Sequence, residues 1–216
     1  MPPTKATTVR RLPDRARYEL SDIHAILDAG LVCHVAFNTE FGPTAIPTLY
    51  ARDGNRVILH GSSVCGMAKG LAAGQRMCVT VTLIDGLVLA RSAFHHSANY
   101  RSVMLFGNVS LIESEDEKRR ALDALMNHLT PGRASHVRAP NPQELKATAV
   151  LALPIDEASA KVRKGGPKDD PEDIDWPVWA GVVPLSLTAG EPIVDGTPRG
   201  DLESEILGRI RAIAPA

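Results

Sequence analysis

A glycine and two serines separate an apolar stretch from a helical pattern in the first third of the chain. The stretch LHGSSVCGMAKGL, residues 59–71, has Gly61, Ser62 and Ser63 at this junction and Lys69 within the helical pattern. Hydroxyl groups and free amides at a helix start can bond phosphate oxygens, the helix dipole favours an anion, and an ammonium group adds a charge-assisted bond. The junction therefore predicts a phosphate-binding site.

Three histidines stand at positions where a ligand could meet them. His60 ends the apolar stretch and could donate a hydrogen bond or relay a proton. His95 and His96 are adjacent, and on an extended chain their side chains would point to opposite faces. No carboxylate is suitably spaced near the pair, so we predict no metal centre there. We expect the pair to line a pocket or a subunit interface.

The composition argues against several classes of partner. The 216 residues carry a formal net charge of -1, which gives no general attraction to nucleic acid or to an anionic membrane surface. No window approaches the roughly 20 apolar residues of a membrane span, and the start of the sequence lacks the apolar core of a signal peptide. We expect a cytoplasmic protein with neither a nucleic-acid nor a membrane partner. Cys33, Cys65 and Cys78 are widely spaced, which predicts buried free thiols.

Alternating apolar patterns and turn signals predict a mainly β chain with added helices. The expected strands are residues 31–38, 42–53, 56–61, 76–84, 87–94, 100–113, 148–155, 158–165 and 178–187. The expected helices are residues 21–29, 64–73, 114–129 and 201–213. Asp85 and Gly86 predict a turn between two strands, and Gly107 predicts a bulge or bend within one.

Strands in hairpin order with a few helices favour an antiparallel barrel of about six to eight strands over a doubly wound sheet. We expect one domain over residues 21–190, an N-terminal extension over 1–20 and a C-terminal extension with a helix over 191–216. The acidic, turn-rich run over 165–175 predicts an exposed loop.

Three stretches together resemble the pyridoxamine 5'-phosphate oxidase-related superfamily, the FMN-binding split barrels. They are TAIPTLYARDGNRVILHGSSVCGMAKGL, VTVTLIDGLVLARSAFHHSANYRSVMLFGNV and VWAGVVPLSL. The resemblance runs from about Ala16 to Leu187 and points to the flavin-nucleotide-binding branch. It implies a split β-barrel and a homodimer that binds two FMN molecules at the subunit interface.

The resemblance also implies which residues meet the flavin. One strand lies along the flavin and the residues after it meet the phosphate, at the positions of Leu59, His60, Gly61, Ser62 and Lys69.

A second strand brings its backbone to the ring at Thr44, Ala45, Ile46 and Pro47. Because Pro47 has no amide hydrogen, Ile46 and Thr48 would carry any backbone bonds at that point.

The last implied contacts come from the YRSV segment and from a tryptophan. In the oxidases a glutamine commonly reaches the flavin from this segment, and here Ser102 stands at its place. Arg101, on the other side of the pleat, could bond phosphate or acid groups. Trp179 either packs the last strand onto the barrel, which we favour, or closes over the flavin from the partner subunit.

Two classes of function remain open. The stretch LSLTAGEPIVDGTPRG, residues 185–200, lacks the arginine cluster of the oxidases, which argues against pyridoxamine phosphate as the substrate. The first class is an FMN-dependent oxidoreductase with a small-molecule donor or acceptor such as NAD(P)H. The second is a non-catalytic protein that binds or sequesters flavin, deazaflavin or haem. Haem would need an axial ligand from His60, His95 or His96.

Overall fold

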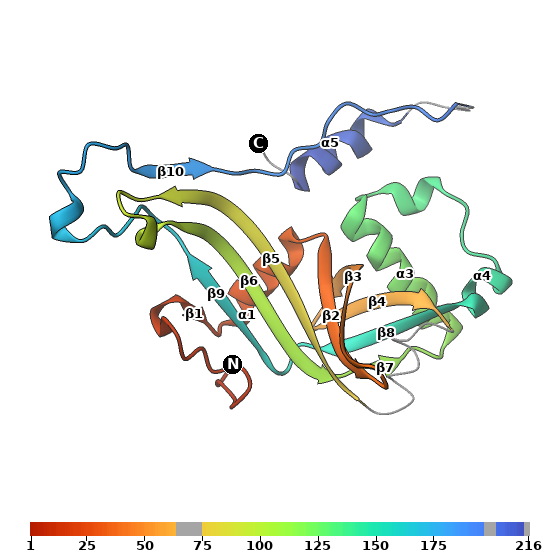
Figure 1. Cartoon of the computed structure of the whole chain (residues 1–216). Helices are drawn as coiled ribbons and strands as arrows, with labels where there is room; N and C mark the ends of the chain where they lie inside the picture. Colours follow the sequence, from red (N-terminus) through yellow and green to blue (C-terminus); the bar gives the residue numbers. More distant parts are fainter. Residues whose placement is uncertain (64–74, 197–201, 214–216) are drawn as a thin grey trace.

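A curved, ten-stranded antiparallel sheet with helices packed against it carries the fold (Figure 1). The computed structural model describes residues 1–63, 75–196 and 202–213. The strands follow the order β1-β9-β6-β5-β2-β3-β4-β8-β7, and β10 pairs with β5. The expected mainly β fold with added helices is confirmed. The ten strands exceed the expected six to eight because β1 and β7, with two residues each, are too short to give a pattern in the sequence.

Most elements lie where the patterns place them. The strands are β1 (Ala16–Arg17), β2 (Val32–Thr39), β3 (Gly42–Asp53), β4 (Arg56–Ser62), β5 (Arg76–Leu89), β6 (Ser97–Asn108), β7 (Ser110–Leu111), β8 (Thr148–Pro154), β9 (Ala158–Arg163) and β10 (Gly181–Pro184). The helices are α1 (Leu20–Ala29), α3 (Glu115–Leu129), α4 (Pro142–Ala147) and α5 (Ser204–Ile213), with 3-10 turns η1 (Pro13–Arg15), η2 (Ala93–His95), η3 (Arg133–His136) and η4 (Pro171–Asp173). The helix expected over 64–73 lies outside the described residues.

The centre of the sheet is apolar on both faces. In β4, Val57 and Leu59 point into the main core, whereas Ile58 belongs to a second cluster. The side chains of a strand alternate between the two faces, so a continuous apolar run indicates a strand covered on both sides. The second cover is α3, which buries Ala121 and Leu125 against this cluster.

The predicted turn at Asp85 and Gly86 is wrong. β5 continues through both residues to Leu89, with a shift in its register against β6 between Ile84 and Gly86. Two partners distant in sequence hold this conformation. The carboxylate of Asp85 accepts hydrogen bonds from Arg101 on β6. β10 also passes so close to Gly86 that a Cβ there would lie 3.0 Å from the carbonyl oxygen of Val183.

The separate strand expected over 87–94 is also wrong, because its first residues belong to β5 and Ala93–His95 form η2. The strand expected over 100–113 is divided into β6 and β7, and Gly107 pairs in register with Met77 without the expected bulge. The chain leaves β5 after Asn108, and Ser110 and Leu111 pair with β8. A Cβ at Gly107 would lie 2.9 Å from Cδ1 of Leu153, so a side chain there would press on the core.

The prediction that the cysteines are buried free thiols is confirmed in part. Cys33 is fully buried, and burial raises the pKa of its thiol to about 12. Cys78 is only half-buried, since it lies on the outward side of β5. Both are free thiols, and Cys65 lies outside the described residues.

Gly30 is required by the close packing where α1 passes into β2. A Cβ at this position would lie 2.5 Å from Cγ1 of Val81 and 2.6 Å from the hydroxyl of Tyr50. The Tyr50 hydroxyl donates a 2.6 Å hydrogen bond to the carbonyl of Leu27. Both neighbours are buried in the main core, so neither can move away freely.

Gly30→Ala should therefore lower the free energy of unfolding by about 1–3 kcal/mol, the usual cost of overpacking a core. Urea denaturation monitored by circular dichroism measures this loss. Gly190→Ala is the matched control, because a Cβ at Gly190 meets nothing within 4 Å. Equal stability of the two variants would contradict the packing argument.

Candidate functional site

The sheet opens between β3 and β4. The two strands pair only where Tyr50–Asp53 meets Arg56–Leu59. Beyond this ladder β3 stays with β2, whereas β4 stays with β8 as far as Ser62. No strand in the described part of the chain pairs with the edge of residues 42–49 that faces away from β2. The opening therefore leaves backbone hydrogen-bonding groups of β3 without a strand partner.

A cavity of about 510 Å³ lies at this opening. Leu49 of β3 and His60 of β4 line its base, and α3 with the segment before α4 encloses it. Its other lining residues are Leu122, Asp123, Leu125, Met126, Leu129, Ala134, Val137, Arg138, Ala139, Pro140, Glu144 and Thr148. The volume falls within the roughly 300–1,000 Å³ typical of small-molecule sites. An apolar lining with few polar groups suits a flat, largely apolar ligand.

His60 lines this cavity and has one ring nitrogen that is not satisfied. Its Nδ1 is buried and has no hydrogen-bond partner among the described residues. A buried polar atom without a partner costs about 1–3 kcal/mol.

Arg138 and Glu144 add charge to the cavity wall. The guanidinium of Arg138 lies 2.7 Å from the Glu144 carboxylate. This hydrogen bond holds the pKa of Glu144 below its ordinary value. Both side chains are well exposed, so the pair marks the solvent side of the cavity.

The other residues expected on β3 and β4 face in different directions. Ile46 packs against the main core, whereas Ala45 and Pro47 are exposed. Thr44 lines a separate hollow of about 270 Å³ next to β5. Leu59 is fully buried in the core, so only its backbone is available to a ligand on this strand.

Gly61 and Ser62 continue the ladder with β8, opposite Ala149 and Thr148. Lys69 lies outside the described residues, and the phosphate site expected at this junction stays a prediction.

The residues expected from β6 and the tryptophan are not brought to the cavity within one chain. Arg101 lies in a basic cleft on the β9 side of the sheet and pairs with Asp85 at 2.7 Å. Ser102 donates a 3.4 Å hydrogen bond to the carbonyl of Lys161 on β9. In a single chain the residues expected to contact the flavin therefore lie at several separate places.

The favoured packing role of Trp179 is wrong, because its side chain is 65% exposed. Its ring lies over the backbone of Gly181, where a Cβ would come within 2.7 Å of it. The ring therefore covers its own strand and not the barrel core. The alternative, contact with a ligand across a subunit interface, stays a prediction.

His95 and His96 are held by local partners. His95 Nε2 lies 3.0 Å from the Asp170 carboxylate, and His96 Nδ1 lies 2.9 Å from the carbonyl of Ser92. Neither residue lines a described cavity. Arg91 anchors the same acidic loop, because its guanidinium lies 2.8 Å from Asp169, whose side chain is only 2% exposed. This loop is therefore exposed, as expected, but fixed to the barrel.

Sequence reasoning missed the α3 side of the cavity. Leu122, Leu125, Met126 and Leu129 lie in the helix expected over 114–129, for which the sequence predicted no ligand contact. The sequence signal for it is that the apolar face of α3 is wider than the part packed against the core. Leu125 is buried in the second cluster, whereas Met126 stays 37% exposed at the cavity. The basic cleft was missed too, although the run KVRKGGPK over 161–168 carries three of its cations.

An antiparallel sheet that curls around one core and opens between two neighbouring strands defines a split-barrel protein. The family model described as Pyridoxamine 5'-phosphate oxidase matches residues 19–162. The chain belongs to this family, and the resemblance noted in the sequence is confirmed.

Two solved structures are similar over nearly the whole chain. The flavocytochrome Anf3 from Azotobacter vinelandii shares 41% sequence identity, with a TM-score of 0.90 over 95% of this chain and 97% of that one. An FAD and heme binding protein from Mycobacterium smegmatis shares 37% identity, with a TM-score of 0.84 over 90% of this chain and 96% of that one. Among curated proteins no sequence matches. Within the described residues, the helices are all too short or too polar to cross a membrane.

The contact between His95 and Asp170 predicts a pH dependence. The hydrogen bond that His95 donates to the Asp170 carboxylate, with the nearby acidic side chains, raises the pKa of His95 above its ordinary value. The contact therefore stabilises the fold fully below the unfolded pKa of about 6.5. The stabilisation is lost as the pH rises through the higher folded pKa.

Asp170→Asn should lower the pKa of His95, measured by NMR titration of its ring protons. Glu172→Gln removes a carboxylate of the same loop that does not contact His95, and should leave the His95 titration unchanged. An unshifted titration in Asp170→Asn would show that the contact does not persist in solution.

Proposed function

We propose that this chain is a flavin-binding redox protein. The observation that carries the proposal is the unpaired edge of β3 over residues 42–49, at the opening of the sheet. Its backbone N–H and C=O groups can bond the polar edge of a flat ring, and the strand gives the ring a surface to lie on. The similarity to a flavocytochrome and to an FAD and heme binding protein supports the proposal.

Different residues of β3 would have different roles in binding the flavin ring. Ile46 fixes the strand by packing into the core. Alternate residues of a strand turn their backbone groups to the same edge, and Pro47 has no N–H, so Ala45 and Leu49 supply the nearest donors on the unpaired edge. A bound flavin would supply hydride and single-electron transfer. In this proposal NAD(P)H or another small molecule is the electron donor.

The kind of flavin is a separate question. The sequence resemblance favours FMN, with its phosphate near Ser62 and Lys69, whereas the relative from Mycobacterium smegmatis is described as binding FAD. We retain FMN as the expectation and FAD as its alternative. Release of the bound flavin by heat and its separation by chromatography distinguish the two molecules.

Haem is a second candidate ligand, because His60, whose imidazole is an iron-ligating group, lines an apolar cavity. Among the three histidines named as axial candidates, His95 and His96 each engage one ring nitrogen with a local partner. The imidazole of His60 would ligate the iron, the apolar side chains of α3 would cover the macrocycle, and Arg138 would face its acid groups. Both similar structures are described in terms that include haem or a cytochrome.

The visible spectrum of the freshly purified protein tests both ligands. We expect flavin bands and a Soret band, with the flavin bands bleached under anaerobic conditions by a nicotinamide donor. His60→Ala should remove the Soret band and keep the flavin, because an iron–nitrogen bond is lost while the edge of β3 is intact.

His96→Ala is the matched control and should keep both sets of bands. Protein that is colourless and takes up neither FMN nor FAD would contradict flavin binding. A Soret band of full strength in His60→Ala would contradict the role of His60.

A homodimer is part of the proposal. Large apolar side chains are exposed on β5, β6 and the segment around β10, which is more apolar surface than scattered single residues would give. They are Ile84, Leu87, Met104, Trp176, Trp179, Val183, Leu185, Leu187 and Ile193. The family resemblance implies that the flavin lies at the subunit interface, so contact of Ser102 and Trp179 with the ligand of the other copy is part of this proposal.

Light scattering should therefore give twice the mass of one chain. Leu87→Glu should shift the protein toward monomer, because it places a charge in the middle of this apolar surface. Leu111→Glu is the control, since Leu111 is similarly exposed on β7, an end strand of the sheet, five places from β5 in the order. A wild-type monomer would contradict the proposed dimer.

A further inference from the structure

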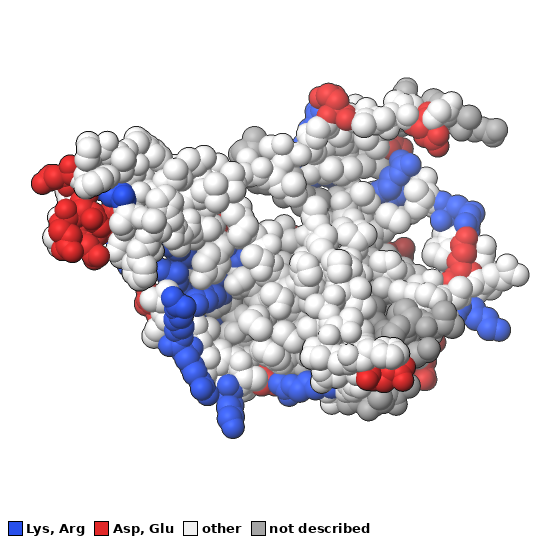
Figure 2. All heavy atoms as spheres, viewed as in Figure 1, with Lys and Arg blue, Asp and Glu red and all other residues white. Residues whose placement is uncertain are grey.

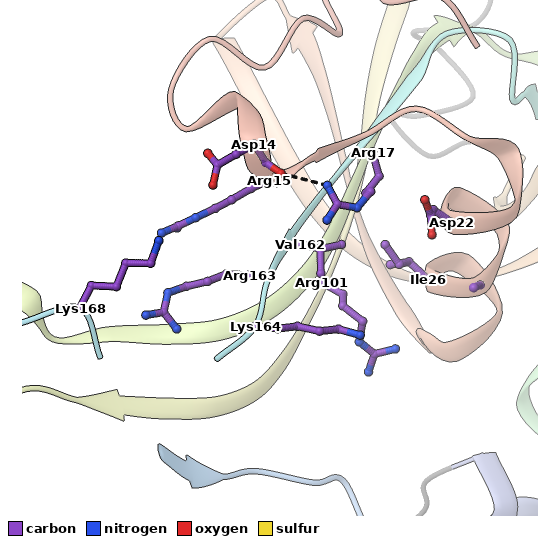
Figure 3. Close-up of a pocket in the computed structure, with 11 residues that line it drawn as sticks. Asp14, Arg15, Arg17, Asp22, Ile26, Arg101, Val162, Arg163, Lys164 and Lys168 are labelled. Carbon is purple, nitrogen blue, oxygen red and sulfur yellow. Dashed lines mark hydrogen bonds between the residues drawn. The ribbon is translucent and has the colours of Figure 1, made fainter. Parts of the chain in front are cut away.

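A basic cleft lies between the N-terminal segment, α1 and the strands β6 and β9 (Figure 3). Its volume is about 520 Å³. Lysines and arginines in its lining outnumber carboxylates six to two. The cations are Arg15, Arg17, Arg101, Arg163, Lys164 and Lys168, and the carboxylates are Asp14 and Asp22.

Most of these cations are not neutralised by the protein. Arg101 pairs with Asp85. Within the described residues, the other five cations form no ion pair with a carboxylate. Arg17 donates only to the carbonyl oxygens of Asp14 and Ala16, at 3.0 and 2.7 Å. The cleft therefore keeps an excess of positive charge although the whole chain is close to neutral.

Arg163 is the most constrained of the cations. Its side chain is only 6% exposed and donates to the side-chain oxygen of Asn99 and to the carbonyls of Gly165 and Gly166. Burial, and then the charge of Arg15, lower the pKa of this guanidinium. Two like charges that approach each other beside a cavity destabilise the protein until an anion lies between them.

The arrangement favours a polyanion over a single small ion. The cations come from three parts of the chain, namely η1 with β1, β6, and β9 with the loop after it. A lone phosphate would reach only some of them, whereas the cleft has room for a nucleotide. Arginine and lysine are the residues that bind phosphate groups through charge-assisted bonds.

We propose that this cleft binds the diphosphate group of a nucleotide. This second site goes beyond the proposed function, because its cations lie apart from the cavity that His60 lines. The diphosphate has two chemical sources, a free dinucleotide such as the electron donor or the second half of an FAD bound to the protein. Figure 2 shows Lys and Arg side chains gathered on this side of the molecule, beside acidic side chains on the loop before β10.

Titration of the purified protein, with its bound cofactors, with ADP tests the proposal by calorimetry. ADP should bind, inorganic pyrophosphate should compete and adenosine should not. Lys164→Gln should weaken binding about 10- to 100-fold, the effect of losing one charged hydrogen bond. Lys164 is exposed, so the variant should fold as the wild type does.

Lys146→Gln is the matched control, since Lys146 is an exposed lysine on α4, outside the cleft lining. It should leave ADP binding unchanged, and equal weakening by both variants would overturn the proposal. The flavin content of each variant separates the two sources. If ADP does not bind but Lys164→Gln loses FAD and retains added FMN, the diphosphate is that of the flavin. If ADP does not bind and the flavin content is the same in all proteins, no diphosphate occupies the cleft.

Discussion

The short ladder between β3 and β4 is the constraint on which the rest of this structure depends. β3 is held along most of its length by β2, and β4 by β8, so the two strands share only the residues next to their turn. A full ladder would close the sheet over the place where Leu49 and His60 now line a cavity. The opening thus exists because each strand gains more hydrogen bonds from its other neighbour.

Burial of β4 and β8 on both faces makes this opening rigid. Leu59 and Leu151 fill the main core, while Ile58 and Val150 pack under α3. The strand that carries His60 is therefore fixed from both sides. Rigid strands position a ligand better than loops do, and the buried Nδ1 of His60 is the polar atom that this rigidity leaves without a partner.

Much of the fold was predictable because strand and helix signals are local. The continuous apolar run of β4, the turn before it and the serine cap of α3 each follow from a few neighbouring residues. The turn predicted at Asp85 and Gly86 was wrong because Arg101 and β10 determine the conformation there, and no local pattern reveals these distant contacts. The cavity and the basic cleft could not be located for the same reason. Each is lined by segments far apart in the sequence, so only the folded chain brings them together.

The acidic loop of residues 169–175 makes the electrostatic field around the molecule uneven. Arg91 and His95 bind Asp169 and Asp170 and so hold the loop against the barrel. The loop lies next to the basic side chains on that side of the molecule (Figure 2). Opposite charges fixed near each other form a local dipole, which repels an approaching anion at one end and attracts it at the other. Such steering acts on the rate of encounter more than on the strength of binding, and salt screens it over about 10 Å. A chain with a net charge close to zero can in this way select how a charged molecule approaches it.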